Sequence, residues 1–189
     1  MDTIITLNDI SKTFGKKTIL DHITAQFSKG SITGIVGRNG SGKTVLFKCI
    51  CGLLKIDEGE IIVQGQHIGD GLKVPDGVGS IIGNVGFLPS ISGYKNLLYL
   101  ASLSGKVDHY RIREVINIVG LDPESRMHVG NYSTGMRQRL GIAQAILDNP
   151  DLLILDEPMN GLDNEGVKNM RRLLQLLQGQ GKTIILASH

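Results

Sequence analysis

The sequence contains no tryptophan, two cysteines and five prolines, and aromatic side chains make up 4% of its 189 residues. The cysteines, Cys49 and Cys51, are two positions apart, and side chains with this spacing do not face each other on a helix. We therefore expect neither a disulfide nor a shared metal ion. We interpret both cysteines as small apolar core residues of a protein in a reducing compartment.

Long apolar runs and a strong net charge are also absent. No run approaches the roughly 20 residues of a membrane-spanning helix, and the start, MDTIITLNDI, lacks the basic region and apolar core of a signal peptide. The net charge of +2 gives no sign of a nucleic-acid-binding surface. Charged pairs such as Arg111/Arg113 and Arg171/Arg172 are expected on solvated helix faces. We expect a soluble, cytoplasmic protein that reaches a membrane only through a partner.

The hydrophobic pattern predicts an α/β protein. The hydrophobic content of 41% is enough for one compact domain. Short strands are expected at 3–7, 22–27, 31–36 and 61–65, and loops or short strands at 66–93. Two continuous apolar segments, LLILD (152–156) and TIILAS (183–188), are typical of strands buried on both faces in a parallel sheet. A helix is expected between them, at 164–178.

A helical block interrupts these strands, from Tyr94 to Asn149. Helices are expected at 96–104 and 109–120, and a third starts at about Ser133. In this third helix an apolar stripe runs along one face, formed by Met136, Leu140, Ala143 and Leu147.

The segment GRNGSGKT lies between a predicted strand and a predicted helix, which is the context that the phosphate-binding pattern G-x-x-x-x-G-K-[ST] requires. Gly40 and Gly42 let the backbone approach phosphate oxygens, and backbone N–H groups and the helix N-terminus then bind them. Lys43 would neutralise the β- and γ-phosphates, and the Thr44 hydroxyl would bind Mg²⁺. The predicted nucleotide-binding residues here are Gly37, Arg38, Asn39, Gly40, Ser41, Gly42, Lys43, Thr44 and Val45.

Two carboxylates follow the apolar strand LLILD. Asp156 is at its C-terminal end, the edge of an open parallel sheet at which ligands bind, and is predicted to hold Mg²⁺. Glu157 follows directly and is predicted to orient a water molecule and accept its proton during attack on the γ-phosphate. On their own, Asp-Glu-Pro would merely begin a turn; the upstream phosphate loop favours the catalytic interpretation.

Further segments resemble the ABC-type ATPases, in order and over residues 3–189. Tyr132-Ser133-Thr134-Gly135-Met136 resembles the signature usually written LSGGQ, and Asn160-Gly161-Leu162-Asp163 resembles the D-loop that follows. His189 resembles the switch histidine. Ser-Lys-Thr-Phe-Gly at 11–15 resembles the loop whose aromatic residue, here Phe14, stacks on adenine.

The resemblance implies a P-loop NTPase core with a mainly parallel sheet, an N-terminal antiparallel β subdomain and an inserted α-helical subdomain. The core would comprise 1–87 and 150–189, and the helical subdomain 88–149. It also implies ATP and Mg²⁺ as cofactors, with Glu157, Lys43 and His189 as catalytic residues.

The expected partners are a second ATPase domain, identical or different, and an integral membrane permease. In the ATPase dimer, Ser133 and Gly135 would close on the γ-phosphate of the partner. The protein would lie on the inner face of the cell membrane, and its permease is expected to dock at Tyr94 to Leu100. No nucleic acid is expected.

Two features depart from the family pattern. Gly83 occupies the position at which a glutamine is usual, and the adjacent Asn84 could supply the missing polar contact. Nearby, VGFLPSISGYKNL resembles antibiotic-export and bacteriocin-immunity members. Family domains continue past the switch histidine, whereas this chain stops there. We therefore expect a truncated chain with weak ATPase activity.

The favoured function is the ATP-hydrolysing subunit of an ABC transporter. One alternative is a non-transport ABC ATPase, although such proteins usually have long insertions or two fused cassettes. Another is a phosphotransferase or regulatory switch, which would leave YSTGM and NGLD unexplained. A third is a nucleotide-binding partner with little turnover.

Overall fold

A computed structural model describes residues 2–69, 74–105 and 108–188 of the chain. His189 and residues 70–73 of the glycine-rich segment lie outside the described residues. The elements, in chain order, are β1 (Thr3–Phe14), β2 (Lys17–Ser28), β3 (Ile32–Val36), α1 (Lys43–Ile50), β4 (Glu58–Val63), β5 (Gln66–Ile68), β6 (Val78–Ile81), α2 (Gly93–Ser104), α3 (His109–Ile118), a 3₁₀ turn (Val129–Asn131), α4 (Thr134–Ala145), β7 (Leu152–Asp156), α5 (Asn164–Gly179) and β8 (Thr183–Ser188).

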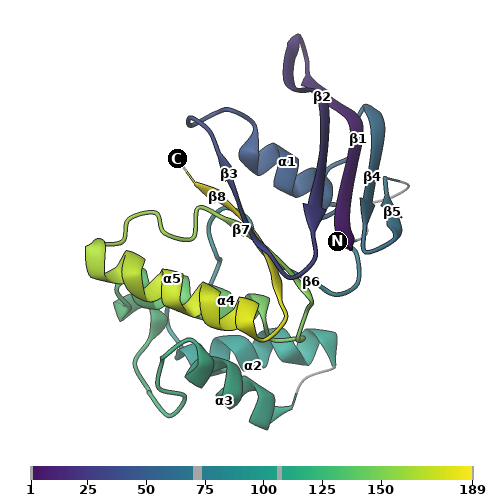
Figure 1. The fold of residues 1–189 in the computed structure, drawn as a ribbon. Helices are drawn as coiled ribbons and strands as arrows, with labels where there is room; N and C mark the ends of the chain where they lie inside the picture. The colour runs from purple at the N-terminus through teal and green to yellow at the C-terminus, as the bar shows by residue number, and fades with distance from the viewer. Residues whose placement is uncertain (1, 70–73, 106–107, 189) are drawn as a thin grey trace.

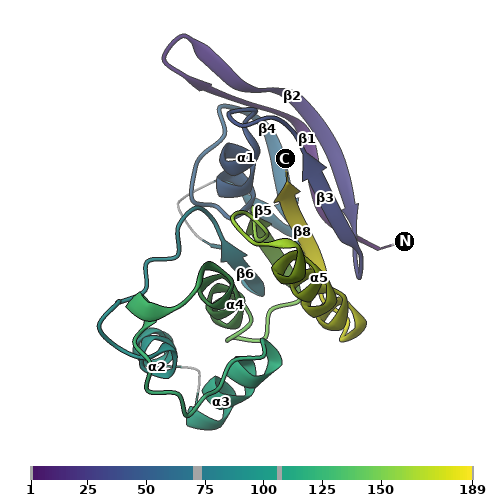
Figure 2. The same ribbon diagram turned by 90° about the vertical axis from the view of Figure 1, so that its left-hand side faces the viewer.

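The strands form two sheets with different pairing. The first is antiparallel, in the order β2-β1-β4-β5, and the second is parallel, in the order β3-β8-β7-β6. Helix α1 packs between them, and α2 to α5 lie on the other side of the parallel sheet (Figures 1 and 2). The predicted α/β fold, with its antiparallel part and inserted helices, is confirmed.

The strand β7 divides the core into two layers. Leu152 and Ile154 pack with α1 and the antiparallel sheet, whereas Leu153 and Leu155 pack with the helical layer. All four side chains are fully buried. This alternation explains why the segment LLILD is apolar throughout, because each of its faces covers a different core.

The first two strands are longer than predicted. Each has a residue in the left-handed region, Asp9 with φ 53° and His22 with φ 48°, and the register between β1 and β2 shifts between Leu7 and Ile10. Such bulges interrupt the alternation of apolar and polar side chains. The sequence pattern therefore ends at these positions, although hydrogen bonding continues to Phe14.

The predicted helices and the apolar stripe of the third are confirmed. Ser133 begins α4 as its N-cap and accepts a hydrogen bond from Met136 N at 3.2 Å. Leu140, Ala143 and Leu147 are buried, and Met136 packs against the same core. In the described part of the chain, no helix has the length and hydrophobicity that crossing a bilayer requires.

The prediction that Arg111 lies on a solvated helix face is wrong. Its Nε donates to Leu147 O at 3.0 Å and its Nη2 to Ile146 O at 2.6 Å. These carbonyls lie at the C-terminal end of α4, where backbone acceptors lack helical partners. Arg111 therefore joins α3 to the end of α4. Arg171 and Arg172 are exposed, as predicted.

The interpretation of Cys49 and Cys51 as apolar packing residues is confirmed. Both are free thiols and fully buried. Burial raises the pKa of Cys49 to about 11 and that of Cys51 to about 12. The thiolate that oxidation and metal binding require is therefore scarce at neutral pH.

Candidate functional site

The loop GRNGSGKT connects the end of β3 to the start of α1. Gly42 is the N-cap of α1 with φ 94°, and a Cβ atom there would lie 3.1 Å from the backbone oxygen of Ile19. Gly40 also has a positive φ, of 79°. The two glycines fold the backbone back onto the helix N-terminus, where N–H groups without helical partners can bind an anion.

Lys43 is the first residue of α1, and its side chain turns back over the loop. Its Nζ donates to Gly37 O at 2.6 Å and to Arg38 O at 3.2 Å, and it lies 3.7 Å from Glu157 Oε1. Only 8% of the residue is exposed. The ammonium group is thus held between the loop and a carboxylate, as a charge that phosphate oxygens can approach.

Thr44 and Asp156 meet although they are far apart in sequence. Thr44 Oγ1 donates to Asp156 Oδ2 at 2.6 Å, while the buried Asp156 Oδ1 has no hydrogen-bond partner. A hydroxyl beside a carboxylate oxygen fits Mg²⁺, which usually takes one or two protein oxygens together with phosphate oxygens and water. No group of three or more His, Cys, Asp and Glu side chains that could hold a metal occurs among the described residues. Phosphate oxygens would therefore have to complete such a site.

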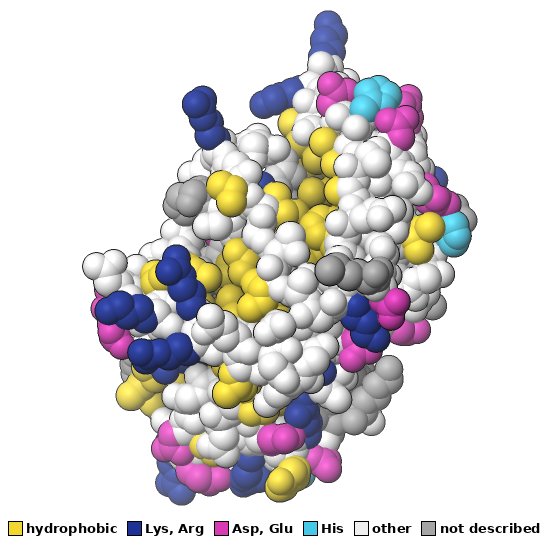
Figure 3. Space-filling model, in the orientation of Figure 1, with side chains coloured by type: hydrophobic (Ala, Val, Ile, Leu, Met, Phe, Trp, Pro, Cys, Tyr) yellow, Lys and Arg dark blue, Asp and Glu magenta, His cyan; other side chains and the backbone are white. Residues whose placement is uncertain are grey.

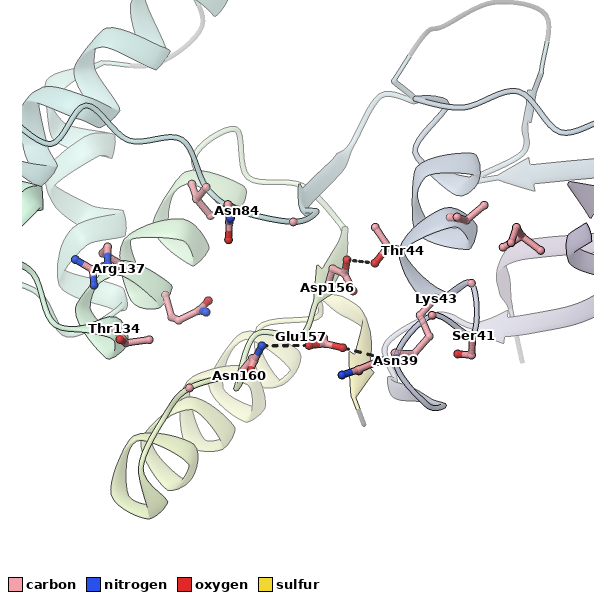
Figure 4. Close-up of a pocket in the computed structure, with 18 of the residues that line it drawn as sticks. Asn39, Ser41, Lys43, Thr44, Asn84, Thr134, Arg137, Asp156, Glu157 and Asn160 are labelled. Carbon is pink, nitrogen blue, oxygen red and sulfur yellow. Dashed lines mark hydrogen bonds and ion pairs between the residues drawn. The ribbon is translucent and has the colours of Figure 1, made fainter. Parts of the chain in front are cut away.

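Glu157 follows β7 in a strained backbone conformation, with φ 51°. Its Oε2 accepts a hydrogen bond from Asn160 Nδ2 at 3.3 Å, while Oε1 faces Lys43. Left-handed residues without special turn chemistry are uncommon, and they gather at functional sites. The strain turns the carboxylate out of the sheet and toward the phosphate loop (Figure 4).

These groups line one cleft of about 990 Å³. Figure 4 shows the phosphate loop on one wall, Asn84, Thr134 and Arg137 on the other, and Asp156, Glu157 and Asn160 between them. Of the predicted residues, the lining includes Asn39, Gly40, Ser41, Gly42, Lys43, Thr44, Val45, Asp156 and Glu157. Gly83 lines it too, with φ 71°, and no protein atom lies near the position of a Cβ there.

Other predicted residues lie outside this lining. Gly37 and Arg38 act through their carbonyl groups, which accept from Lys43. Ser133 and Gly135 are in the first turn of α4, but of this turn it is Thr134 and Arg137 that line the cleft. Phe14 is at the end of β1, 48% exposed. His189 lies outside the described residues.

The cleft is also lined by residues that the sequence analysis did not single out. Lys17 and Ile19 come from the β1–β2 hairpin, and Arg137 and Gln138 come from α4. Asn160, in the segment that resembles the D-loop, lines the cleft as well. A helical spacing from Thr134 could have found Arg137 and Gln138, which follow it by three and four residues and therefore face the same way. The hairpin residues reach the cleft through sheet pairing and tertiary packing.

The parallel sheet, the glycine-rich loop at a helix N-terminus and the carboxylates at the C-terminal edge of the sheet define a P-loop nucleotide-binding protein. Comparison with known families narrows this class, because residues 20–160 match the model described as "ABC transporter". The chain belongs to this ABC transporter family.

Known relatives agree with this assignment. The chain is 42% identical over its whole length to the uncharacterized ABC transporter ATP-binding protein YdbJ of Bacillus subtilis and to the bacitracin transport ATP-binding protein BcrA of Bacillus licheniformis. It spans 62% of the length of each. The solved ATP-binding cassette MJ1267, in its ADP conformation, has a TM-score of 0.87 at 25% identity, with 100% of this chain and 82% of that chain covered.

The unpartnered oxygen of Asp156 predicts a measurable cost to stability. In Asp156→Asn, an uncharged amide should replace the carboxylate whose Oδ1 is buried without a hydrogen-bond partner. We expect the free energy of unfolding to rise by about 1 kcal/mol in EDTA, as measured by chemical denaturation. The exposed Asp148→Asn is the control and should change stability by less than about 0.5 kcal/mol. A lower stability of Asp156→Asn in EDTA would contradict this account.

Proposed function

We propose that the chain binds and hydrolyses ATP and powers the movement of a substrate through a separate membrane subunit of an ABC transporter. The observation that carries this proposal is the meeting of Lys43, Thr44, Asp156 and Glu157 at one end of a single cleft. Membership of the ABC transporter family and the likeness to a cassette solved with ADP support it.

The chain's own groups divide the work of hydrolysis. The loop N–H groups and Lys43 bind the phosphates. Thr44 and Asp156 would hold Mg²⁺, which would neutralise negative charge on the phosphates. Glu157 orients a water molecule and accepts its proton during attack on the γ-phosphate. Its contacts with Asn160 and Lys43 fix the carboxylate on the cleft side.

The proposal includes a dimer and a base site. Ser133 and Gly135 lie outside the lining of their own cleft, which supports a role toward the γ-phosphate of a second ATPase domain, identical or different. Phe14 is the proposed adenine-stacking residue. It is half-exposed at the end of β1, and the next strand of the hairpin, β2, lines the cleft. His189 is proposed to contact the γ-phosphate. The division into a core (1–87 and 150–189) and a helical subdomain (88–149) is part of this proposal.

We place the protein on the cytoplasmic face of the membrane, bound to its permease. The segment VGFLPSISGYKNL and the 42% identity to BcrA support membership of the antibiotic-export or bacteriocin-immunity subgroup. An alternative is a nucleotide-binding partner with little turnover. Gly83 favours this alternative, because it brings no polar side chain to the cleft at the position where family members have a glutamine.

The role of Glu157 separates these two functions. We expect Glu157→Gln to lower ATP turnover by about 10²-fold or more, because the amide cannot accept the proton, with little change in ATP affinity. Phosphate release and ATP binding are measured on the same samples. Glu165→Gln, at an exposed position in the first turn of α5, is the matched control. If parent and Glu157→Gln bind ATP but are equally inert, the binding-only function replaces hydrolysis.

Asn84 is proposed to supply the polar contact that Gly83 lacks. It lines the cleft on the wall opposite Thr44 and within the same space as Asp156 (Figure 4). We expect Asn84→Ala to lower Mg²⁺-dependent ATP turnover by about tenfold, the effect of losing one hydrogen bond at the reacting group. Asn169→Ala, on α5 and away from the cleft lining, serves as a control. Unchanged turnover and nucleotide affinity in Asn84→Ala would remove this role.

The permease is proposed to dock at Tyr94 to Leu100 on α2. Tyr99 is 56% exposed, and Leu103, one turn further along the helix, is 71% exposed. Apolar side chains exposed in this way are suited to burial against a partner helix. We expect a photo-crosslinker at position 99 to label the membrane subunit and one at exposed Gln175 on α5 not to. Labelling from position 175 alone would place the contact elsewhere.

A further inference from the structure

The tip of the β1–β2 hairpin lies beside the cleft, and only two strands form it. β1 pairs with β4 as far as Ser11, opposite Glu58. Beyond Ser11, β1 pairs only with β2, with Phe14 opposite Lys17. A two-stranded ribbon alone is marginally stable in water. Yet β2 supplies Lys17 and Ile19 to the cleft, so the tip needs a further contact to keep its place.

Asp57 supplies this contact from the loop between α1 and β4. Its backbone N–H donates to Ser11 O at 2.9 Å. Its carboxylate accepts from Lys12 Nζ at 2.6 Å through Oδ1 and from Thr13 N at 2.7 Å through Oδ2. One residue thus binds three consecutive residues of β1, at the point where β1 leaves β4. Both oxygens of the carboxylate are used, and charge-assisted hydrogen bonds of this kind are the stronger ones.

Lys12, which is bound to Asp57, also contacts the aromatic ring of Phe14. Its Nζ lies 5.5 Å from the centroid of the Phe14 ring, within the range of a cation–π interaction. The Lys12 side chain is 13% exposed, so the ammonium group is fixed between the Asp57 carboxylate and the ring. Phe14 itself keeps 48% of its surface exposed. The ring is therefore held by Lys12 while much of it stays accessible to a ligand.

We propose that Asp57 and Lys12 are positioning residues that hold the hairpin tip and the Phe14 ring in the arrangement that receives the nucleotide base. This inference rests on the proposed function, in which Phe14 stacks on adenine. Neither residue is part of the cleft lining, so neither is expected to contact the phosphates. Together they set the affinity for the base part of the nucleotide and leave the affinity for its phosphates unchanged.

The charges of the pair suit this role. The hydrogen bonds from Lys12 and from the Thr13 backbone lower the pKa of Asp57. Its carboxylate therefore stays ionised throughout the neutral range. Asp57 also follows directly on the segment that leaves α1, the helix that begins at Lys43. The segment from Lys43 to Asp57 thus carries the proposed phosphate-binding residues at its start and holds the hairpin tip with the Phe14 ring at its end.

The test compares a whole nucleotide with its phosphate part. Dissociation constants for MgATP and for Mg²⁺ with inorganic tripolyphosphate are measured by calorimetry on the full chain. We expect Asp57→Ala and Lys12→Met each to weaken ATP binding about three- to tenfold and tripolyphosphate binding less than twofold. Lys12→Arg keeps both the ion pair and the cation over the ring and should restore ATP affinity. Asp9→Asn, in an exposed ion pair with His22 on the same sheet, is the matched control.

Each other outcome identifies what is wrong. Equal weakening of ATP and tripolyphosphate binding would show a general structural effect and overturn the positioning role. Normal ATP affinity in both Asp57→Ala and Lys12→Met, with reduced affinity in Phe14→Ala, would overturn the positioning role alone. Normal ATP affinity in Phe14→Ala would overturn the base site and this inference with it. If the parent chain binds neither ligand, the proposed function itself fails.

Discussion

The hydrogen bond between Thr44 and Asp156 is the contact on which the site depends. Thr44 belongs to α1 and Asp156 to the end of β7, and β8 lies between β7 and the strand β3 that leads into α1. The bond therefore closes the site across the C-terminal edge of the parallel sheet. Because β7 is buried on both faces, its end has little freedom to move, and the phosphate loop is placed against a fixed carboxylate.

The site keeps several local features that a purely structural segment would avoid. Glu157 has a left-handed backbone, Asp156 Oδ1 is buried without a hydrogen-bond partner, and Lys43 is almost fully covered. Each costs free energy that well-packed strands and helices elsewhere must offset. Left-handed residues also occur in the hairpin, at Asp9 and His22, but at this cleft a left-handed glutamate, an unpartnered buried oxygen and a covered lysine lie together. In Figure 3, histidine side chains lie beside acidic ones at the upper right, over the antiparallel sheet, and further acidic and basic side chains cover the helical layer at the bottom of the view.

Features set by neighbouring residues in the sequence could be predicted, whereas several features set by distant contacts could not. The phosphate loop and the strand LLILD are contiguous segments, and the stripe on α4 is periodic, so the sequence pattern predicts each of them. Arg111 was placed wrongly because its acceptors, Ile146 O and Leu147 O, lie at the C-terminal end of another helix, α4. Lys17 was missed because its place in the cleft depends on the register of a bulged hairpin.

The two walls of the cleft are joined through the turn that follows Glu157. Asn160 binds the Glu157 carboxylate, and the neighbouring Gly161 lies so close to α4 that a Cβ atom on it would be 3.5 Å from Thr134 Cγ2. The first turn of α4 thus rests on the same turn that orients the carboxylate. The turn at Asn160 and Gly161 therefore connects the Glu157 carboxylate, which faces Lys43, to the wall of the cleft that carries Thr134.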